Sequence, residues 1–307
     1  MKYKNPHGFR EGVTRRIREE ANAKGIPATR RQMRFLFERF WLRLERAFPV
    51  VVVKGGAALE FRLDRARTTR DLDLSVSHVS GDELLERLQA ACREDLGDFL
   101  TFQVVEDSTL EAEGQRYEGR RLSVTCLLNN QPLFSKFGLD IAVGEPSGTA
   151  ETFTIATTPT AAELGTLQIP LYCLRTHLAE KLHAYTLPRQ YENSRVKDLP
   201  DMGLIAGYRD VSAGDLRGSL RQTFSTRNTH ELPATVPEPP DSWATPYRAM
   251  AKENQLPWLD LVDLHQAVAA FLNPLLGKEL PDAATWDTEG WRWVPPVPAA
   301  TDDPERE

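Results

Sequence analysis

The stretch "KGGAALEFRLDRARTTRDLDLSV", from Lys54 to Val76, decides the fold. It follows an apolar run, Val50 to Val53, which predicts a buried strand. Its last part, Asp71 to Val76, alternates polar and apolar residues and predicts a second strand. Asp71 and Asp73 leave the same face of that strand, with Cα atoms roughly 7 Å apart. Two carboxylates at this spacing are costly to bury unless positive charge lies between them.

The neighbouring segments predict a mixed α/β core. The two glycines after the first strand indicate a turn, and a short helix is expected at 57–63. A second helix is predicted at 82–91, and further strands with period-two alternation are predicted at 100–106, 120–128 and 136–144. Strands and helices alternate before a run of strands. This order favours an α/β (α+β) fold with a mixed sheet and helices on one face.

Helical patterns flank this core on both sides. Before it, a short helix is expected at 14–23, and a longer one begins after Thr29, a plausible N-cap. From about Pro170 the pattern becomes helical. The helices expected there lie within 171–186, 197–207, 215–224 and 258–277, with a long loop at 226–246.

These patterns predict three parts of the chain. N-terminal helices and the core form a domain at 1–168, and a helical C-terminal domain occupies 169–294. A disordered tail is expected at 295–307, which ends in "TDDPERE".

Composition sets broad limits. The chain has 307 residues and a net charge of -6, so no global basic field marks a nucleic-acid binder. Its three cysteines are widely spaced, which favours reduced thiols over disulfides or a zinc site. The N-terminus has no apolar leader, and no run of residues is long enough to span a membrane. We therefore expect a soluble, cytoplasmic protein without a membrane partner.

A third carboxylate, Asp140, is the only charge on its face of the strand "FGLDIAVG". Such a carboxylate needs a partner. If its strand lies beside that of Asp71 and Asp73, the three side chains converge. Three carboxylates can hold two Mg²⁺ ions, or Mn²⁺ in their place, for in-line displacement at phosphorus. For an isolated D-x-D pattern, two solvated aspartates at a strand edge are the commoner explanation.

Four motifs resemble those of the AbiEii/AbiGii-type nucleotidyltransferase toxins of type IV toxin–antitoxin systems, within the DNA polymerase β-like superfamily. In order they are "KGGAALEFRLDRARTTRDLDLSV", "GLDIAVG", "LAEKLHAY" and "RVKDLPDM". The resemblance implies a nucleotidyltransferase fold and activity, an RNA acceptor with the 3′ end of tRNA as the best candidate, and neutralisation by a separately encoded antitoxin.

The resemblance also assigns roles to individual residues. The metal ligands are Asp71, Asp73 and Asp140, which are catalytic together with Lys181, Asp198 and Asp201. The nucleotide-binding set is Lys54, Gly55, Gly56, Thr69, Lys181, Arg195 and Lys197. Pro200 lies within the last motif and leaves the separate roles of Asp198 and Asp201 open.

The residues themselves allow several roles for the later motifs. Lys181 borders the apolar face of its helix, where it either extends to solvent or contributes positive charge to a triphosphate. Asp198 and Asp201 share a face if helical. They cap the helix, tether Lys181 or an arginine, or act as a base. The histidines have no metal-ligand spacing and are interpreted as structural: His177, His183 and His265.

Arginine is concentrated in the first forty-six residues, where a solvated face and an RNA-binding face are about equally expected. The sequence therefore predicts an enzyme that transfers NMP from an NTP to an acceptor hydroxyl. Two alternatives remain open. One is the same chemistry on a small molecule, such as an antibiotic, or on a protein side chain, and the other is a non-catalytic nucleotide- or RNA-binding module.

Overall fold

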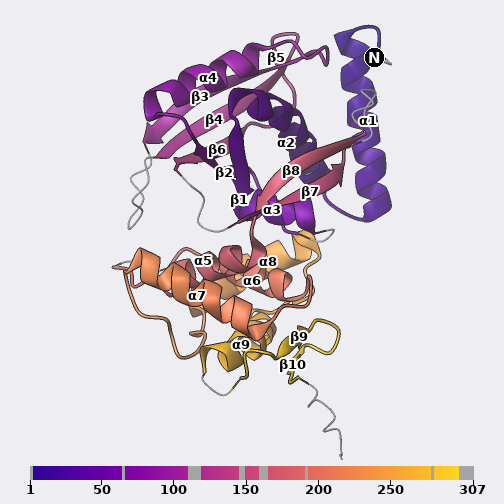
Figure 1. The fold of residues 1–307 in the computed structure, drawn as a ribbon. Helices are drawn as coiled ribbons and strands as arrows, with labels where there is room; N and C mark the ends of the chain where they lie inside the picture. Colours follow the sequence, from indigo (N-terminus) through magenta and orange to yellow (C-terminus); the bar gives the residue numbers. More distant parts are fainter. Residues whose placement is uncertain are drawn as a thin grey trace, which may run out of the picture. The chain divides into compact units, whose positions relative to one another are not determined.

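The computed structural model describes residues 3–63, 66–109, 119–144, 149–158, 165–190, 193–277 and 280–296 (Figure 1). The chain forms two compact units, which are described separately below. The first comprises Met1–His177 and Ala244–Asp260, and the second comprises Leu178–Trp243 and Leu261–Glu307. The domain boundary expected at 168/169 stays a prediction. The expected disordered tail lies outside the described residues except for 295 and 296.

A mixed sheet forms the centre of the first unit. Its strands are β1 (Val50–Lys54), β2 (Asp71–Ser77), β3 (Leu100–Thr109), β4 (Gly119–Leu128), β5 (Gln131–Pro132), β6 (Phe137–Val143), β7 (Ala150–Ala156) and β8 (Thr166–Tyr172). Their order is β3-β4-β6-β2-β1-β8-β7, and β5 pairs with β4. The pairs β2–β6 and β1–β8 are parallel, and the other described pairs are antiparallel. The predicted α/β fold with a mixed sheet is confirmed.

Helices α2 (Ala28–Ala47) and α4 (Gly81–Arg93) pack on the apolar face of this sheet. The other helices of this unit are α1 (Pro6–Lys24), which packs on α2, α3 (Gly55–Arg62) and α8 (Ala244–Asn254). Phe37 and Phe40 of α2 make edge contacts with Phe137 of β6, and Phe40 also meets Phe102 of β3. Because side chains alternate along a strand, Asp140 lies on the face opposite Phe137. The helix-covered core and the carboxylates thus occupy different faces of β6.

The first two helices differ from their predicted bounds. Asn5 caps α1 by accepting a hydrogen bond from the Gly8 N–H at 2.8 Å, and Pro6 occupies its first turn. This helix begins eight residues before the predicted start because Asn-Pro is itself a start signal. In α2 the N-cap is Pro27, so the prediction of Thr29 as the N-cap was wrong.

The region expected to become helical at Pro170 is still sheet. Pro170 lies within β8, opposite Thr152 of β7, and α5 (Leu174–Thr186) begins only after the strand ends. Between β1 and β8, Val53 stands opposite Leu171. A proline fits in β8 because the described ladder to β1 is this short. The sequence pattern missed both β7 and β8.

The second unit is mainly helical. It contains most of α5, then α6 (Asp198–Ala206), α7 (Ala213–Arg227), the short η1 (Asp241–Trp243), α9 (Leu261–Leu276) and the hairpin β9 (Thr285–Asp287) and β10 (Arg292–Val294). Trp286 of β9 is fully buried against Phe271 of α9 and the neighbouring Trp293. The loop predicted at 226–246 is interrupted by the end of α7, by η1 and by the start of α8.

The three cysteines are buried and unpaired, as expected for reduced thiols. Within the described part of the chain, we find no helix with the length and apolarity that a bilayer crossing requires.

Candidate active site

Strand register brings the carboxylates together. In the parallel pair β2–β6, Asp73 stands directly opposite Asp140, and Asp71 stands opposite Gly138. Neighbouring strands lie about 4.8 Å apart, and residues opposite each other share a face. Asp71 is two residues from Asp73 and therefore lies on that face as well. Leu72 and Leu74 are buried on the other face. The three aspartates thus line one face of two adjacent strands.

Two glycines make room for these carboxylates. Gly55 has a φ of +56° at the start of α3, and a Cβ there would overlap the Asp73 carboxylate. A Cβ on Gly138 would lie 2.6 Å from Asp71 Oδ1. The carboxylates therefore lie directly against main chain. Gly138 was not among the predicted site residues, although a glycine inside an apolar strand indicates such a close approach.

The glycine pair begins a helix instead of forming a turn before it. α3 includes both Gly55 and Gly56, so the prediction that the helix starts at Ala57 was wrong. A Cβ on Gly56 would lie 3.0 Å from Thr69 Oγ1 and 3.2 Å from Arg67 Nη2. The first turn of α3 is thus bordered by a hydroxyl and a guanidinium. Such a helix start, with N–H groups and positive dipole, favours anions.

Arg67 is a residue that the sequence analysis missed. Its side chain is buried, although the chain around it is loop. The loop is anchored one residue later, where the Thr68 N–H and hydroxyl both donate to Asn254 Oδ1 of α8, at 2.7 and 2.9 Å. In the sequence, Arg67 is only a basic residue four positions before Asp71. Its importance becomes visible once the structure places it beside Gly56.

Lys54 lies on the carboxylate face. It pairs with Asp73 across the antiparallel β1–β2 ladder, and its Nζ lies 4.5 Å from the centre of the Tyr172 ring. A cation over an aromatic face is held in place without losing its charge. Lys54 therefore supplies positive charge at the edge of the predicted site.

Arg121 of β4 binds Asp140. The two residues are register partners, and the guanidinium donates to both carboxylate oxygens, Nε to Oδ1 at 2.9 Å and Nη2 to Oδ2 at 2.7 Å. This bond and the negative charge of Asp140, followed by those of Asp71 and Asp73, raise the pKa of Arg121. The expected partner of Asp140 is thus a protein cation.

The donor chemistry suits a hard divalent cation. Carboxylate oxygens are the ligands that Mg²⁺ prefers, and three carboxylates share this strand face. With Arg121 on Asp140, no three Asp, Glu, His or Cys side chains in the described ranges are gathered closely enough to hold a metal ion. The residues fit the cation, while the third ligand is engaged by an arginine.

Lys181 is buried in the second unit between two aspartates. Its Nζ lies 2.8 Å from Asp198 Oδ1 and 2.8 Å from Asp201 Oδ2, and its side chain is 13% exposed. The interpretation of a lysine extending to solvent was therefore wrong, and of the roles left open for the two aspartates the structure shows the tether to Lys181. Asp198 and Asp201 do share a face of α6. Pro200 fits there because it occupies the first turn.

The remaining predicted cations precede this pair. Arg195 and Lys197 are exposed, and Arg195 Nη1 lies 4.0 Å from Asp198 Oδ2. The Arg195 side chain is 52% exposed, so this contact contributes little stability. Both cations are available to solvent beside a carboxylate that is itself neutralised.

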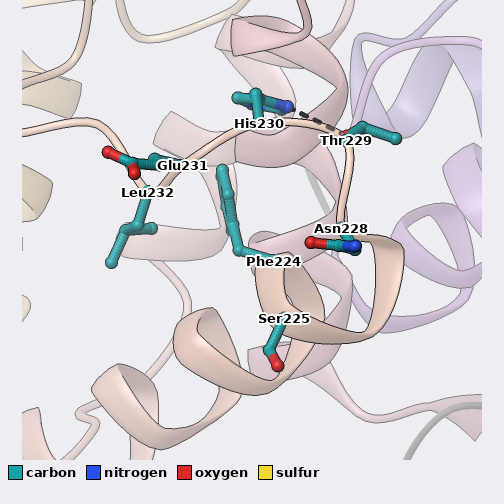
Figure 2. A pocket seen from close by; sticks show the side chains of 7 residues that line it. All are labelled: Phe224, Ser225, Asn228, Thr229, His230, Glu231 and Leu232. Carbon is teal, nitrogen blue, oxygen red and sulfur yellow. Dashed lines mark hydrogen bonds between the residues drawn. The ribbon is translucent and has the colours of Figure 1, made fainter.

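A pocket of about 360 Å³ lies at the end of α7 (Figure 2). Thr229 Oγ1 is hydrogen bonded to His230 Nδ1 at 3.0 Å and to His183 Nε2 at 2.8 Å, and Thr186 Oγ1 reaches His230 Nε2 at 2.8 Å. Burial is the main cause that lowers the pKa of His183, to about 4. These bonds support the structural interpretation of His183.

Many N-terminal arginines serve the interior. Arg30 Nε binds Glu60 at 2.8 and 3.0 Å, and Arg43 forms a two-pronged pair with Asp98. The arginines buried in this way are Arg30, Arg31, Arg39 and Arg43. Arg30, Arg31 and Arg43 hold α2 to neighbouring segments, so neither a solvated nor an RNA-binding face explains these buried side chains. Other basic residues of α1, such as Arg15 and Arg18, are exposed.

The fold and this arrangement of residues fit the class of nucleotidyltransferases. A family model described as the nucleotidyl transferase AbiEii toxin of type IV toxin–antitoxin systems matches residues 34–284. The chain belongs to this family. It is therefore a nucleotidyltransferase with a toxin role, and the resemblance drawn from its four motifs is confirmed. Membership implies a nucleotide substrate and a separate antitoxin.

Solved structures show a more distant likeness. A proposed nucleotidyltransferase from H. pylori is 15% identical with a TM-score of 0.41, and the match covers 78% of this chain and 94% of that one. The structure of JHP933 from Helicobacter pylori gives the same identity and TM-score, with 78% and 91% covered. No curated protein matches the sequence.

Proposed function

We propose that the chain transfers NMP from an NTP to the 3′ end of tRNA, with Mg²⁺ as cofactor and Mn²⁺ as an alternative. The observation that carries the proposal is the register of β2 and β6, which sets Asp73 beside Asp140 on the face that also carries Asp71. Asp71, Asp73 and Asp140 would hold two ions. When bound, such ions neutralise charge on the transferred phosphate and activate the attacking hydroxyl.

The chain's own groups would position the triphosphate. The first N–H groups of α3 lie beside Asp73, and this helix start favours an anion such as a phosphate. Thr69 and Arg67 border that turn, and Lys54 shares the face of Asp73. These groups would orient the α-phosphate for in-line attack. In the second unit we assign Lys181, Arg195 and Lys197 to nucleotide binding, with Asp198 and Asp201 holding Lys181.

The acceptor would be held by exposed basic residues. Arg15 is exposed with its side chain 3.9 Å from Glu19, a pair too solvated to fix it. The protein would act in the cytoplasm, where an antitoxin encoded separately neutralises it. Changing Arg15→Glu together with Arg16→Glu should weaken use of RNA and leave NTP binding unchanged. For every RNA phosphate that these arginines neutralise, the change should flatten the log–log salt dependence of RNA binding by about one unit or less.

One experiment tests the reaction. The protein is incubated with each α-labelled NTP and total cellular RNA, with and without Mg²⁺, beside Asp73→Asn as the control. We expect Mg²⁺-dependent label on RNA of tRNA size with one preferred NTP. Periodate, which destroys the diol of the 3′-terminal ribose, should abolish labelling of pretreated RNA.

Each other outcome points to an alternative. Label that survives periodate would move the acceptor away from the 3′ end. Transfer to protein or to a small molecule, with RNA unlabelled, would replace the RNA acceptor. NTP binding without transfer under all conditions would indicate a non-catalytic module.

A further inference from the structure

Arg121 occupies the carboxylate that the proposed cations need. Both oxygens of Asp140 accept hydrogen bonds from its guanidinium, at 2.9 and 2.7 Å. An oxygen that already faces a guanidinium is a poor metal ligand, because two cations on one carboxylate repel each other. The Arg121 guanidinium and a bound metal ion would therefore compete for the same two oxygens of Asp140.

The arginine is free to leave without disrupting the core. Its side chain is 53% exposed, whereas that of Asp140 is 24% exposed. Exposed pairs contribute little stability, so releasing Asp140 costs little. A guanidinium also matches the oxygens of a phosphate as well as it matches a carboxylate. A triphosphate arriving at this face therefore offers Arg121 a second partner of the same geometry.

We propose that Arg121 is a placeholder for the divalent cation, which holds Asp140 in the metal-free enzyme and releases it when the cation binds. The inference rests on the proposed metal-dependent function. It makes Arg121 a positioning residue that lowers the affinity for the metal alone. Because a triphosphate can take over the guanidinium, metal and nucleotide should favour each other's binding.

The neighbouring arginine provides a matched control. Arg120 lies on the same strand, one residue earlier, and therefore on the opposite face. It pairs with Ile141 in register and forms an ion pair with Glu106 at 2.7 Å. Arg120→Gln removes the same charge from the same strand without touching Asp140. Arg121→Lys keeps the charge at Asp140 but loses the two-pronged geometry.

The test measures Mn²⁺ binding to the full chain by the loss of the free-ion EPR signal, without any turnover. Arg121→Gln should bind Mn²⁺ about three- to tenfold more tightly than wild type, a change of up to about 1.4 kcal/mol. Arg121→Lys should fall between the two, and Arg120→Gln should match wild type. In an Asp140→Asn background, Arg121→Gln should have no further effect, because the contested ligand is gone.

A second readout uses the wild-type protein, in case a variant folds poorly. The Arg121 Nε–H resonance, identified by its loss in Arg121→Lys, should shift on titration with Mg²⁺ at the midpoint of metal binding. Tight Mn²⁺ binding by wild type with no gain in Arg121→Gln would overturn the placeholder and leave the metal site intact. Absence of Mn²⁺ binding in every variant would overturn the metal site itself and the placeholder with it.

Discussion

The molecule contains two groups of neighbouring aspartates, and the repulsion between their carboxylates is reduced in a different way in each group. In the first unit, Asp71 is exposed and Asp73 and Asp140 are partly exposed, on a strand face that also carries Arg121 and Lys54. In the second, Asp198 and Asp201 are buried and share one lysine at 2.8 Å. The first group lies near the surface, whereas the second is enclosed with its counter-ion.

This difference indicates what each group can do. A buried carboxylate without a partner costs several kcal/mol, so enclosed aspartates must be neutralised within the protein. A partly exposed carboxylate remains hydrated at low cost, and a cation from solution can reach it. The sheet face is therefore suited to ligands. The buried group of Lys181 with Asp198 and Asp201 is suited first to fixing α5 against α6.

The largest effect should come from a sheet carboxylate. Asp73→Asn removes a charge between Asp71 and Asp140 and should reduce nucleotide transfer about 10⁴-fold or more, ~5.5 kcal/mol of transition-state stabilisation. Because the side chain keeps its shape and is partly exposed, the free energy of unfolding in urea should change by less than about 1 kcal/mol. A variant that loses activity by unfolding would contradict the assignment of Asp73 to the functional group.

The opposite result is expected for the buried pair. Lys181→Ala leaves two enclosed carboxylates without their cation and should lower the free energy of unfolding by about 3–5 kcal/mol. Adding Asp198→Asn and Asp201→Asn should restore much of the loss in urea denaturation. If Lys181→Ala is as stable as wild type, the contrast between the two groups fails.

The sequence predicted the elements that carry the site, because their signals are local. The apolar run of β1, the glycine pair and the alternation from Asp71 onward each depend on a few consecutive residues. Asp140 was identified in the same way, as a single charge in an apolar strand. These signals identified the carboxylates before any strand pairing was known.

The contacts between strands were not predictable, because register is a property of the folded sheet. Arg121 stands opposite Asp140 and Gly138 opposite Asp71, and each of these pairs joins two different strands. β8 was missed because a proline and a following helical pattern outweighed a short strand signal. The partners of Lys181 lie on another helix, so the sequence offered its tether to Asp198 and Asp201 only as one of several roles. The local sequence pattern thus identifies the carboxylates but not the residues on other strands and helices that contact them.

A subtler change tests the sheet group without altering a charge. Gly138→Ala places a Cβ 2.6 Å from Asp71 Oδ1 and should displace that carboxylate. We expect about tenfold weaker Mn²⁺ binding, ~1.4 kcal/mol, because a ligand oxygen has moved. Since the side chain of Asp71 can rotate, stability should change by less than about 1 kcal/mol.

The matched control for this change is Gly218→Ala in α7. No atom lies within 4 Å of a Cβ there, and alanine favours a helix over glycine, so stability should rise slightly and metal binding should not change. Unaltered Mn²⁺ affinity in Gly138→Ala would show that the position of Asp71 does not matter for the cation.

The smallest effect concerns the pH dependence of stability. It tests whether the second unit also buries a neutral titratable side chain, that of His183. The pKa of His183 is lowered from 6.5 to about 4, mainly by burial. Between these values the unfolded chain binds a proton that the folded chain does not, so stability is full above pH 6.5 and falls as the pH drops towards 4. We expect the free energy of unfolding to fall by about 1 kcal/mol, or Tm by 2–4 °C, between pH 7 and pH 5.

Two variants check this prediction. His183→Gln should lower Tm at pH 7 because its hydrogen bond to Thr229 is removed, but it should flatten the pH dependence of stability. His7→Gln, which changes a side chain that is 83% exposed, should leave it unaltered. Hydrogen exchange resolves the location: α5 and α7 should lose protection at pH 5 before β2 and β6 do. Equal loss of hydrogen-exchange protection in both units at pH 5 would mean that protonation of His183 does not destabilise the second unit in particular.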